Sequence, residues 1–203
     1  MYSKSPFKMQ QQACFDLLES QPFGLLTTCA QGKITQAFLP FILDKESNCL
    51  YGHLAQQNGQ INALYKSSDL TITFQGEHAY ISPNWYESDE QVPTWNYQAV
   101  VVTGNAVLLN NSETLKVITA LSNRHEAQFE TPWTMDKLPQ KKTQAMLKAI
   151  TGFRIEIAEV NGISKMSQNK SVRDKNGVVF GLKNQPDQAS KNIASLISTL
   201  YTN

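Results

Sequence analysis

The sequence predicts a mainly β protein with flanking helices, an antiparallel sheet closed into a small barrel with the helices packed outside it. Seven runs of strand-forming residues are present, and the first three are separated by short connections at residues 30–33 and 44–47. Connections that short join antiparallel neighbours, because a parallel crossover needs a dozen or more residues. The chain has 203 residues and an apolar share of 41%. It is therefore long enough to bury a core, and we expect a single domain over residues 1–203.

The predicted elements begin with a helix over residues 9–20, where Cys14, Leu17 and Leu18 recur at helical spacing before Pro22. Alternating or continuous apolar runs then predict strands at 23–29, 34–43, 48–54, 70–74, 78–82, 95–109 and 152–160. Further helices are predicted at 60–66, from about 110 to 128, at 140–150 and at 187–201. The last helix is amphipathic, since Ile193, Leu196 and Ile197 lie on one stripe.

The cysteine pattern and the lack of long apolar runs predict a soluble cytoplasmic protein. Cys14, Cys29 and Cys49 form no C-x-x-C pair and no even-numbered disulfide framework, which favours a reducing compartment. The N-terminal lysines are not followed by the apolar run of a signal peptide. No apolar stretch approaches the roughly 18 residues that span a membrane, so we expect no membrane association.

Most common catalytic motifs are absent from the sequence. It contains no G-x-G-x-x-G, no G-x-x-x-x-G-K-[ST] and no G-x-S-x-G. His125-Glu126 resembles the start of a zinc-protease motif, but Phe129 stands where the second histidine is required. We therefore predict no metal site and assign no catalytic residue.

Three polar clusters are candidate binding regions, each with a simpler structural explanation. Residues 74–97 interleave aromatic rings with amides and hydroxyls, which suits a flat heteroaromatic ligand or equally a loop covering a barrel end. Residues 50–59 lead from a strand into a short helix. The free backbone N–H groups at the start of that helix suit an anion, or the segment is simply a strand-to-helix connection. Residues 162–170 combine hydroxyls, amides and Lys165, which fits a phosphate site or a surface loop.

Taken in order, these clusters resemble the PaiB family of FMN-binding negative transcriptional regulators. The specific blocks are I-S-P-x-W-Y at residues 81–86 and V-P-T-W-N-Y at 92–97. Weaker matches are G-H-L-A at 52–55 with Asn58, R-H-E at 124–126 and K-M-S-Q-N at 165–169. The resemblance implies the FMN-binding split-barrel fold of pyridoxamine-phosphate oxidase, and a homodimer with the flavin between subunits.

The resemblance also assigns cofactor-binding residues. It places the phosphate and ribityl chain beside His53, Leu54, Ala55 and Asn58. It places the flavin ring or its surroundings beside Trp85, Trp95, Asn96, Lys165, Ser167, Gln168 and Asn169.

Three positions depart from the family pattern. Phe38 stands where a histidine is expected before Leu-Pro, Gly59 replaces a proline, and Ile163 replaces the first lysine of a Gly-Lys-x-Lys pattern. A lost charge-assisted contact costs roughly 1.5–3 kcal/mol, or about ten- to a hundredfold in affinity. We therefore expect FMN binding weaker than the family pattern predicts, with its complete loss as the extreme case.

Three functions follow from the sequence and the resemblance. The first is a flavin-responsive negative regulator of transcription, acting directly or indirectly; no helix-turn-helix pattern supports direct DNA binding. The second is an FMN-dependent oxidoreductase, in which the flavin performs the redox chemistry. The third is a small-molecule binding protein without turnover.

The net charge of +1 conceals an asymmetry along the chain. Residues 1–136 carry a net charge of −6 and residues 137–203 a net charge of +7. The basic C-terminal part is consistent with a solvated face, or with a surface that binds a ligand phosphate or nucleic acid.

Overall fold

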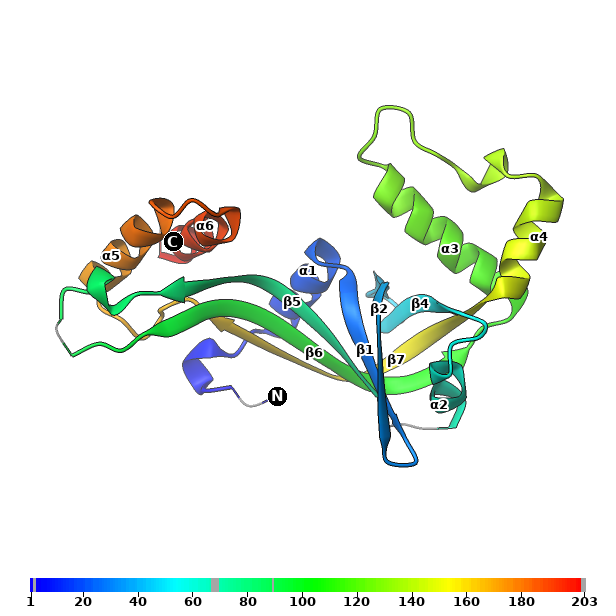
Figure 1. Ribbon diagram of the computed structural model, residues 1–203, viewed down its shortest axis with the longest axis horizontal. Helices are drawn as coiled ribbons and strands as arrows, with labels where there is room; N and C mark the ends of the chain where they lie inside the picture. Colours follow the sequence, from blue (N-terminus) through cyan, green and yellow to red (C-terminus); the bar gives the residue numbers. More distant parts are fainter. Residues whose placement is uncertain (2, 67–69, 89, 202–203) are drawn as a thin grey trace. The chain divides into compact units, whose positions relative to one another are not determined.

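The computed structural model describes residues 1, 3–66, 70–88 and 90–201. Its described strands are β1 (Phe23–Ala30), β2 (Lys33–Pro40), β3 (Ile42–Asp44), β4 (Cys49–Ala55), β5 (Leu70–Ile81), β6 (Thr94–Leu108) and β7 (Ile150–Lys165). They form one sheet in the order β2-β1-β5-β6-β7-β4-β3, with helices flanking it (Figure 1). The registers of β1 with β2 and β5, and of β4 with β3 and β7, are all antiparallel. The predicted fold class is confirmed.

The described helices are α1 (Gln11–Ser20), α2 (Gln60–Lys66), α3 (Asn111–Glu126), α4 (Gln140–Ala149), α5 (Val172–Lys183) and α6 (Gln188–Tyr201). Single 3₁₀ turns form at η1 (Ser5–Phe7), η2 (Pro83–Trp85) and η3 (Met135–Lys137). Asn110 begins α3 with a capping box, in which its side chain accepts from the Glu113 backbone N–H and the Glu113 carboxylate accepts from the Asn110 N–H. Among the described helices, none combines the length and apolar character needed to cross a membrane.

The strand order itself shows that the sheet closes on itself. β2 and β3 lie at opposite ends of the order, yet only Phe41 separates them in the chain. Two consecutive Cα atoms are about 3.8 Å apart, so a single residue cannot bridge a flat seven-stranded sheet. The two edges must therefore meet, as they do in a barrel. The Phe41 side chain is buried at this junction and packs edge-on against Phe74 and Phe153.

The chain divides into two compact units that share the three long strands. The barrel unit comprises Phe15–Phe74 and Val101–Val160, and the terminal unit comprises Met1–Cys14, Gln75–Val100 and Asn161–Asn203. The expectation of a single domain stays a prediction. Each unit buries its own apolar side chains, and we describe them separately.

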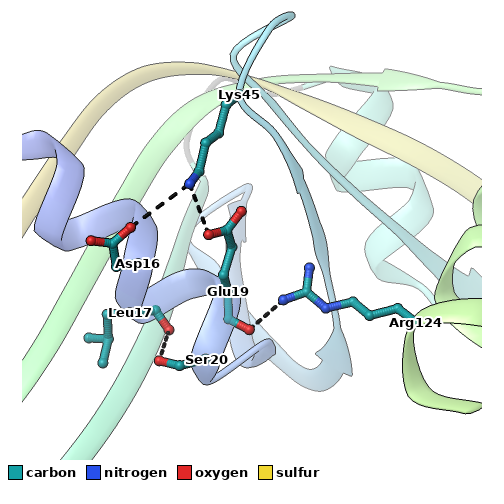
Figure 2. A network of polar contacts seen from close by, with 6 residues as sticks. All are labelled: Asp16, Leu17, Glu19, Ser20, Lys45 and Arg124. Carbon is teal, nitrogen blue, oxygen red and sulfur yellow. Dashed lines mark hydrogen bonds and ion pairs between the residues drawn. The ribbon is translucent and has the colours of Figure 1, made fainter. Parts of the chain in front are cut away.

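In the barrel unit, a polar network connects α1, the β3–β4 turn and α3 (Figure 2). The Lys45 ammonium lies 2.9 Å from Glu19 Oε2 and 3.9 Å from Asp16 Oδ1. The Arg124 guanidinium donates to the backbone carbonyl of Glu19, next to the end of α1. A cation at that end stabilises the exposed carbonyls of the last helical turn.

The terminal unit has an apolar core formed by one face of β5 and the facing sides of α5 and α6. Its buried members are Ala79, Ile81, Tyr86, Met166, Val178, Leu182, Ile193, Ala194 and Ile197. Two glycines of α5 allow η2 to approach closely. A Cβ at Gly177 would lie 2.0 Å from the Trp85 carbonyl oxygen, and one at Gly181 would lie 2.3 Å from the Trp85 ring.

Several predicted boundaries were wrong. Residues 34–43 form two strands rather than one, because the chain turns at Phe41. Residues 70–74 and 78–82 belong to the single strand β5, which continues through Gly76. The strand predicted at 152–160 extends over Ile150–Lys165, and α5 was not predicted.

Candidate functional site

The terminal unit contains a cavity of about 540 Å³ walled by aromatic side chains. Trp85 and Trp95 both line it, together with His78 and Tyr80. Trp95 is half exposed, and its ring meets that of Tyr80 edge-on at 5.9 Å and that of His78 at 6.2 Å. Such a wall offers stacking surface to a planar ligand. The two tryptophans of the I-S-P-x-W-Y and V-P-T-W-N-Y blocks thus meet at one cavity.

The opposite wall of this aromatic cavity is polar. It includes Asp187 and Ser190 at the start of α6, and Gln185. Asp187 Oδ1 accepts a hydrogen bond from the Ser190 backbone N–H at 2.8 Å. The hydrogen bonds from Ser190 hold the pKa of the Asp187 carboxyl below its ordinary value. Asp187 is therefore a carboxylate at neutral pH, which accepts hydrogen bonds and repels a phosphate.

The other predicted residues of the terminal unit lie on β6, at the end of β7 and in the turn after β7. Consecutive strand residues point to opposite faces, so Trp95 and its neighbours Thr94 and Asn96 cannot share a face. Asn96 is fully buried, and its Nδ2 donates to Ser167 Oγ at 2.9 Å. The Lys165 ammonium donates to Thr94 Oγ1. The structure thus pairs Asn96 with Ser167 and Lys165 with Thr94.

A cluster of three lysines lies near the end of β7. Burial lowers the pKa of Lys165, and the nearby charges of Lys170 and Lys4 lower it further. The Lys170 ammonium bonds to Gln91 Oε1 and lies 4.9 Å from the centre of the Tyr86 ring. Like charges gathered in this way favour an anion between or beside them.

The residues from 166 to 169 form the turn that follows β7. Ser167 adopts a left-handed conformation with φ of 59°. Gln168 Oε1 accepts from the Met166 N–H at 2.6 Å, and its Nε2 donates to the Ser164 carbonyl. The Gln168 amide therefore shapes the turn, whereas Asn169 is exposed.

The four remaining predicted residues lie in the barrel unit. His53 and the buried Leu54 belong to β4, and the exposed Ala55 is its last residue. Asn58 Oδ1 accepts from the Gln60 N–H at 2.9 Å and so caps α2. The Asn58 side chain thus has a structural partner within its own turn.

His53 lines a second cavity, of about 490 Å³, between α3, α4 and the barrel strands. Burial lowers the pKa of His53 below its ordinary value of 6.5, so the ring is neutral at pH 7. Its Nδ1 is buried and has no hydrogen-bond partner. Glu126 is among the lining residues, and none of the described residues that line it is Lys or Arg.

The eleven predicted residues therefore fall into three groups: Trp85 with Trp95 at the aromatic cavity, the group around Asn96 and Lys165, and the group around His53 in the barrel unit. Their cofactor roles stay predictions. His78, Tyr80 and Lys170 lie in the candidate regions but were not assigned as cofactor-binding residues, and Lys4 lies outside those regions. The sequence could have predicted that Tyr80 and His78 share a face, because they are two residues apart on β5. No local pattern could have predicted that Lys4 lies near Lys165, because the two residues are far apart in the chain. In the described part of the chain, no group of three or more His, Cys, Asp or Glu side chains is arranged to hold a metal ion.

Comparison with known proteins gives consistent matches. A family model described as "Putative FMN-binding domain" matches residues 1–159. The chain is 34% identical over 200 residues to the protease synthase and sporulation protein PAI 2 of Bacillus subtilis, covering 97% of this chain and 96% of that protein.

Solved structures match the fold at low sequence identity. The flavocytochrome Anf3 from Azotobacter vinelandii aligns with a TM-score of 0.60 and 14% identity, over 80% of this chain and 72% of that one. The FAD and heme binding protein from Mycobacterium smegmatis aligns with a TM-score of 0.59 and 12% identity, over 82% and 77%. The predicted split-barrel fold is confirmed.

Proposed function

Because the chain belongs to the PaiB-like family of FMN-binding domains, we propose that it binds FMN and acts as a negative regulator of transcription. When bound, FMN supplies a redox-active ring that responds to the state of the cell. The protein's own residues would hold the flavin and transmit its presence.

The aromatic cavity is the observation that carries flavin binding. Its volume of about 540 Å³ lies within the range of small-molecule sites, roughly 300–1,000 Å³. Trp85 and Trp95 supply ring surfaces, and the Asp187 carboxylate and Ser82 supply polar groups at the margin. This combination fits a flat heteroaromatic ring with a polar edge. The Asp187 charge argues that the phosphate lies elsewhere.

The lysine cluster is the part of the terminal unit that suits the phosphate. Lys165 and Lys170 are half-buried, and Lys4 is close enough to depress the pKa of Lys165. Ile163, where the family pattern has a lysine, is buried and only 5% exposed. Lys4 and Lys170 offset the charge that Ile163 does not provide.

A homodimer is supported by an exposed apolar face on the barrel unit. Phe23 and Phe38 stack at 6.0 Å between ring centres while remaining 62% and 67% exposed. Ile34 is exposed on the same strand as Phe38 and lies four residues away, so it shares that face. Exposed large apolar side chains of this kind mark association surfaces. We infer that a second copy of the chain covers them.

The experiment titrates FMN into the purified protein and follows quenching of flavin fluorescence. Trp95→Ala should weaken binding by about tenfold or more, because stacking on one ring contributes about 1–3 kcal/mol. Tyr65→Ala, which removes an exposed ring of the barrel unit, is the matched control and should leave the affinity unchanged. A protein that takes up no FMN would overturn the proposal.

The regulatory role needs its own measurement. Binding to operator DNA that falls steeply with salt would show direct regulation, since counterion release dominates such complexes. Lys141, Lys142 and Lys148 are exposed on α4, and neutralising all three should weaken that binding. FMN-dependent oxidation of NAD(P)H with no effect on DNA would contradict the regulatory role and favour an oxidoreductase.

A further inference from the structure

Backbone pairing brings the N-terminal segment alongside the end of β7. Lys8 forms an antiparallel bridge with Ile163 of that strand. In antiparallel pairing, the residues that precede one partner lie beside the residues that follow the other. The chain before Lys8 therefore runs toward Lys165, the last residue of β7. The Lys4 ammonium is accordingly close enough to act on the charge of Lys165.

The turn after β7 brings a third amine to the same place. The Lys170 backbone N–H donates to the Ser167 carbonyl at 3.0 Å, so the chain folds back shortly after Lys165. The Lys170 charge acts on Lys165 and also on the Asp174 carboxylate. In the part of the chain that the structure describes, no carboxylate lies within ion-pair distance of Lys4, Lys165 or Lys170. The three amines therefore stand close together with little neutralisation.

Lys165 has the surroundings of a nucleophilic amine. It is half-buried, and its Nζ donates to the neutral Thr94 Oγ1 rather than to a carboxylate. Burial lowers the pKa of Lys165, and the charges of Lys170 and Lys4 lower it further. A larger share of this amine is therefore neutral at pH 7, and only the neutral form has the lone pair that attacks a carbonyl carbon. Desolvation and neighbouring cations are the two ways in which proteins activate a lysine.

The two neighbouring lysines favour one class of carbonyl compound. Ammonium groups beside the nucleophile attract an anionic substituent, and charge-assisted hydrogen bonds to phosphate are among the strongest. The Lys170 ammonium is positioned by Gln91 Oε1 and by the Tyr86 ring, whose centre lies 4.9 Å away. A compound that carries both a phosphate and an aldehyde therefore finds a partner for each group.

We propose that Lys165 forms an imine with small phosphorylated aldehydes, whose phosphate is held by Lys170 and Lys4. The neutral amine attacks the aldehyde carbon, and a proton passes from the nitrogen to the aldehyde oxygen to give a carbinolamine. Loss of water then leaves the C=N bond, and no electrons are transferred. The proposal rests on the phosphate-binding lysines of the proposed function, but it requires no bound flavin.

The test treats the full chain, without added FMN, with glycolaldehyde phosphate and traps the imine with cyanoborohydride. Glycolaldehyde, which lacks the phosphate, is the matched probe. Peptide mapping by mass spectrometry compares Lys165 with Lys141 and Lys183, which are exposed. The phosphorylated probe should label Lys165 at least about tenfold faster than either exposed lysine, and about tenfold faster than glycolaldehyde does. Equal labelling of the three lysines, or no advantage for the phosphorylated probe, would overturn the proposal.

Three variants separate the nucleophile from the charges around it. Lys165→Arg keeps the charge but forms no imine, so phosphate-selective labelling should disappear from the whole chain rather than move to Lys170. Lys170→Gln should slow labelling of Lys165 by about tenfold and remove most of the advantage of the phosphorylated probe. Lys183→Gln, which removes an exposed charge at the end of α5, is the matched control and should leave Lys165 unaffected. Equal effects of Lys170→Gln and Lys183→Gln would contradict the site.

The pH profile and FMN uptake are independent readouts. Because the pKa of Lys165 lies below its ordinary value of 10.5, its labelling should reach a plateau at a lower pH than that of Lys183. Coincident profiles would contradict the activation of Lys165. Flavin fluorescence measures FMN uptake separately. FMN binding without selective labelling of Lys165 overturns the imine and leaves flavin binding standing, whereas selective labelling in a protein that takes up no FMN does the reverse.

Discussion

The two cavities differ in the charges that surround them, although each has tryptophan in its described lining. The cavity lined by His53 has Glu126 and the negative end of α3 at its wall and no lysine or arginine among its described lining residues. In the terminal unit, which contains the aromatic cavity, Lys4, Lys165 and Lys170 lie close to one another. An apolar or aromatic lining alone therefore does not identify a ligand; the nearby charges decide which unit favours a phosphate.

The terminal unit depends most strongly on the close approach of α5 to η2. Gly177→Ala places a Cβ about 2.0 Å from the Trp85 carbonyl oxygen, a backbone atom that cannot rotate away. We expect a loss of about 3 kcal/mol in the free energy of unfolding, measured by urea denaturation. Gly59→Ala is the control in the barrel unit, where a Cβ meets nothing within 4 Å. Equal stability of the two variants would contradict the packing described.

The buried pair Asn96–Ser167 tests whether Asn96 is structural. Asn96→Ala removes the donor to Ser167 Oγ at a site that is fully buried. Leaving that hydroxyl unpaired should cost about 2 kcal/mol of stability. Asn169→Ala, an exposed neighbour in the same turn, should change stability by less than about 0.5 kcal/mol. If Asn96→Ala weakened flavin binding without loss of stability, Asn96 would be a direct ligand instead.

The barrel unit should show a pH dependence that originates at His53. Its pKa is lowered in the folded protein by burial, so the unfolded chain takes up a proton first as the pH falls. Stability is therefore full above pH 6.5 and declines below it by at most about 1.4 kcal/mol per pH unit, until the folded pKa is reached. His53→Gln should remove this decline, so that the variant is as stable below pH 6.5 as it is above it. An identical acid profile in wild type and variant would contradict the assignment.

The smallest effect concerns the ion pair at Lys45. Both Lys45 and Glu19 are partly exposed, and their 2.9 Å contact is accessible to solvent and salt. Lys45→Gln should lower the free energy of unfolding by about 0.5 kcal/mol, and the difference should shrink in high salt. Thermal denaturation at two ionic strengths measures it. A loss of several kcal/mol would mean that the network in Figure 2 stabilises α1 more than an exposed pair allows.

The barrel was predictable from sequence because short connections and a period of two are local signals. Its closure at Phe41 was not, since residues 34–43 have the character of one strand and contain no turn residue except Pro40. Helix α5 was missed because Gly177, Gly181 and three valines disfavour a helix; Trp85 requires those glycines through a tertiary contact.

The site was predictable only in part, because some of its contacts join residues that are far apart in the chain. The family blocks contain Trp85 and Trp95, which line one cavity, and their roles toward the flavin stay predictions. Alternation along β6 implies that Trp95 and Asn96 face opposite sides. The approach of Lys4 to Lys165 joins residues far apart in the chain, which no local pattern reveals.

We propose that the terminal unit holds the flavin at two places, with its ring in the aromatic cavity and its phosphate at the lysine cluster. Comparing FMN with riboflavin, which lacks the phosphate, tests it most directly. FMN should bind at least about tenfold more tightly, and Lys165→Gln with Lys170→Gln should abolish that difference while leaving riboflavin binding intact. Equal affinity for FMN and riboflavin in the wild-type protein, or a preference that survives loss of both lysines, would contradict the account.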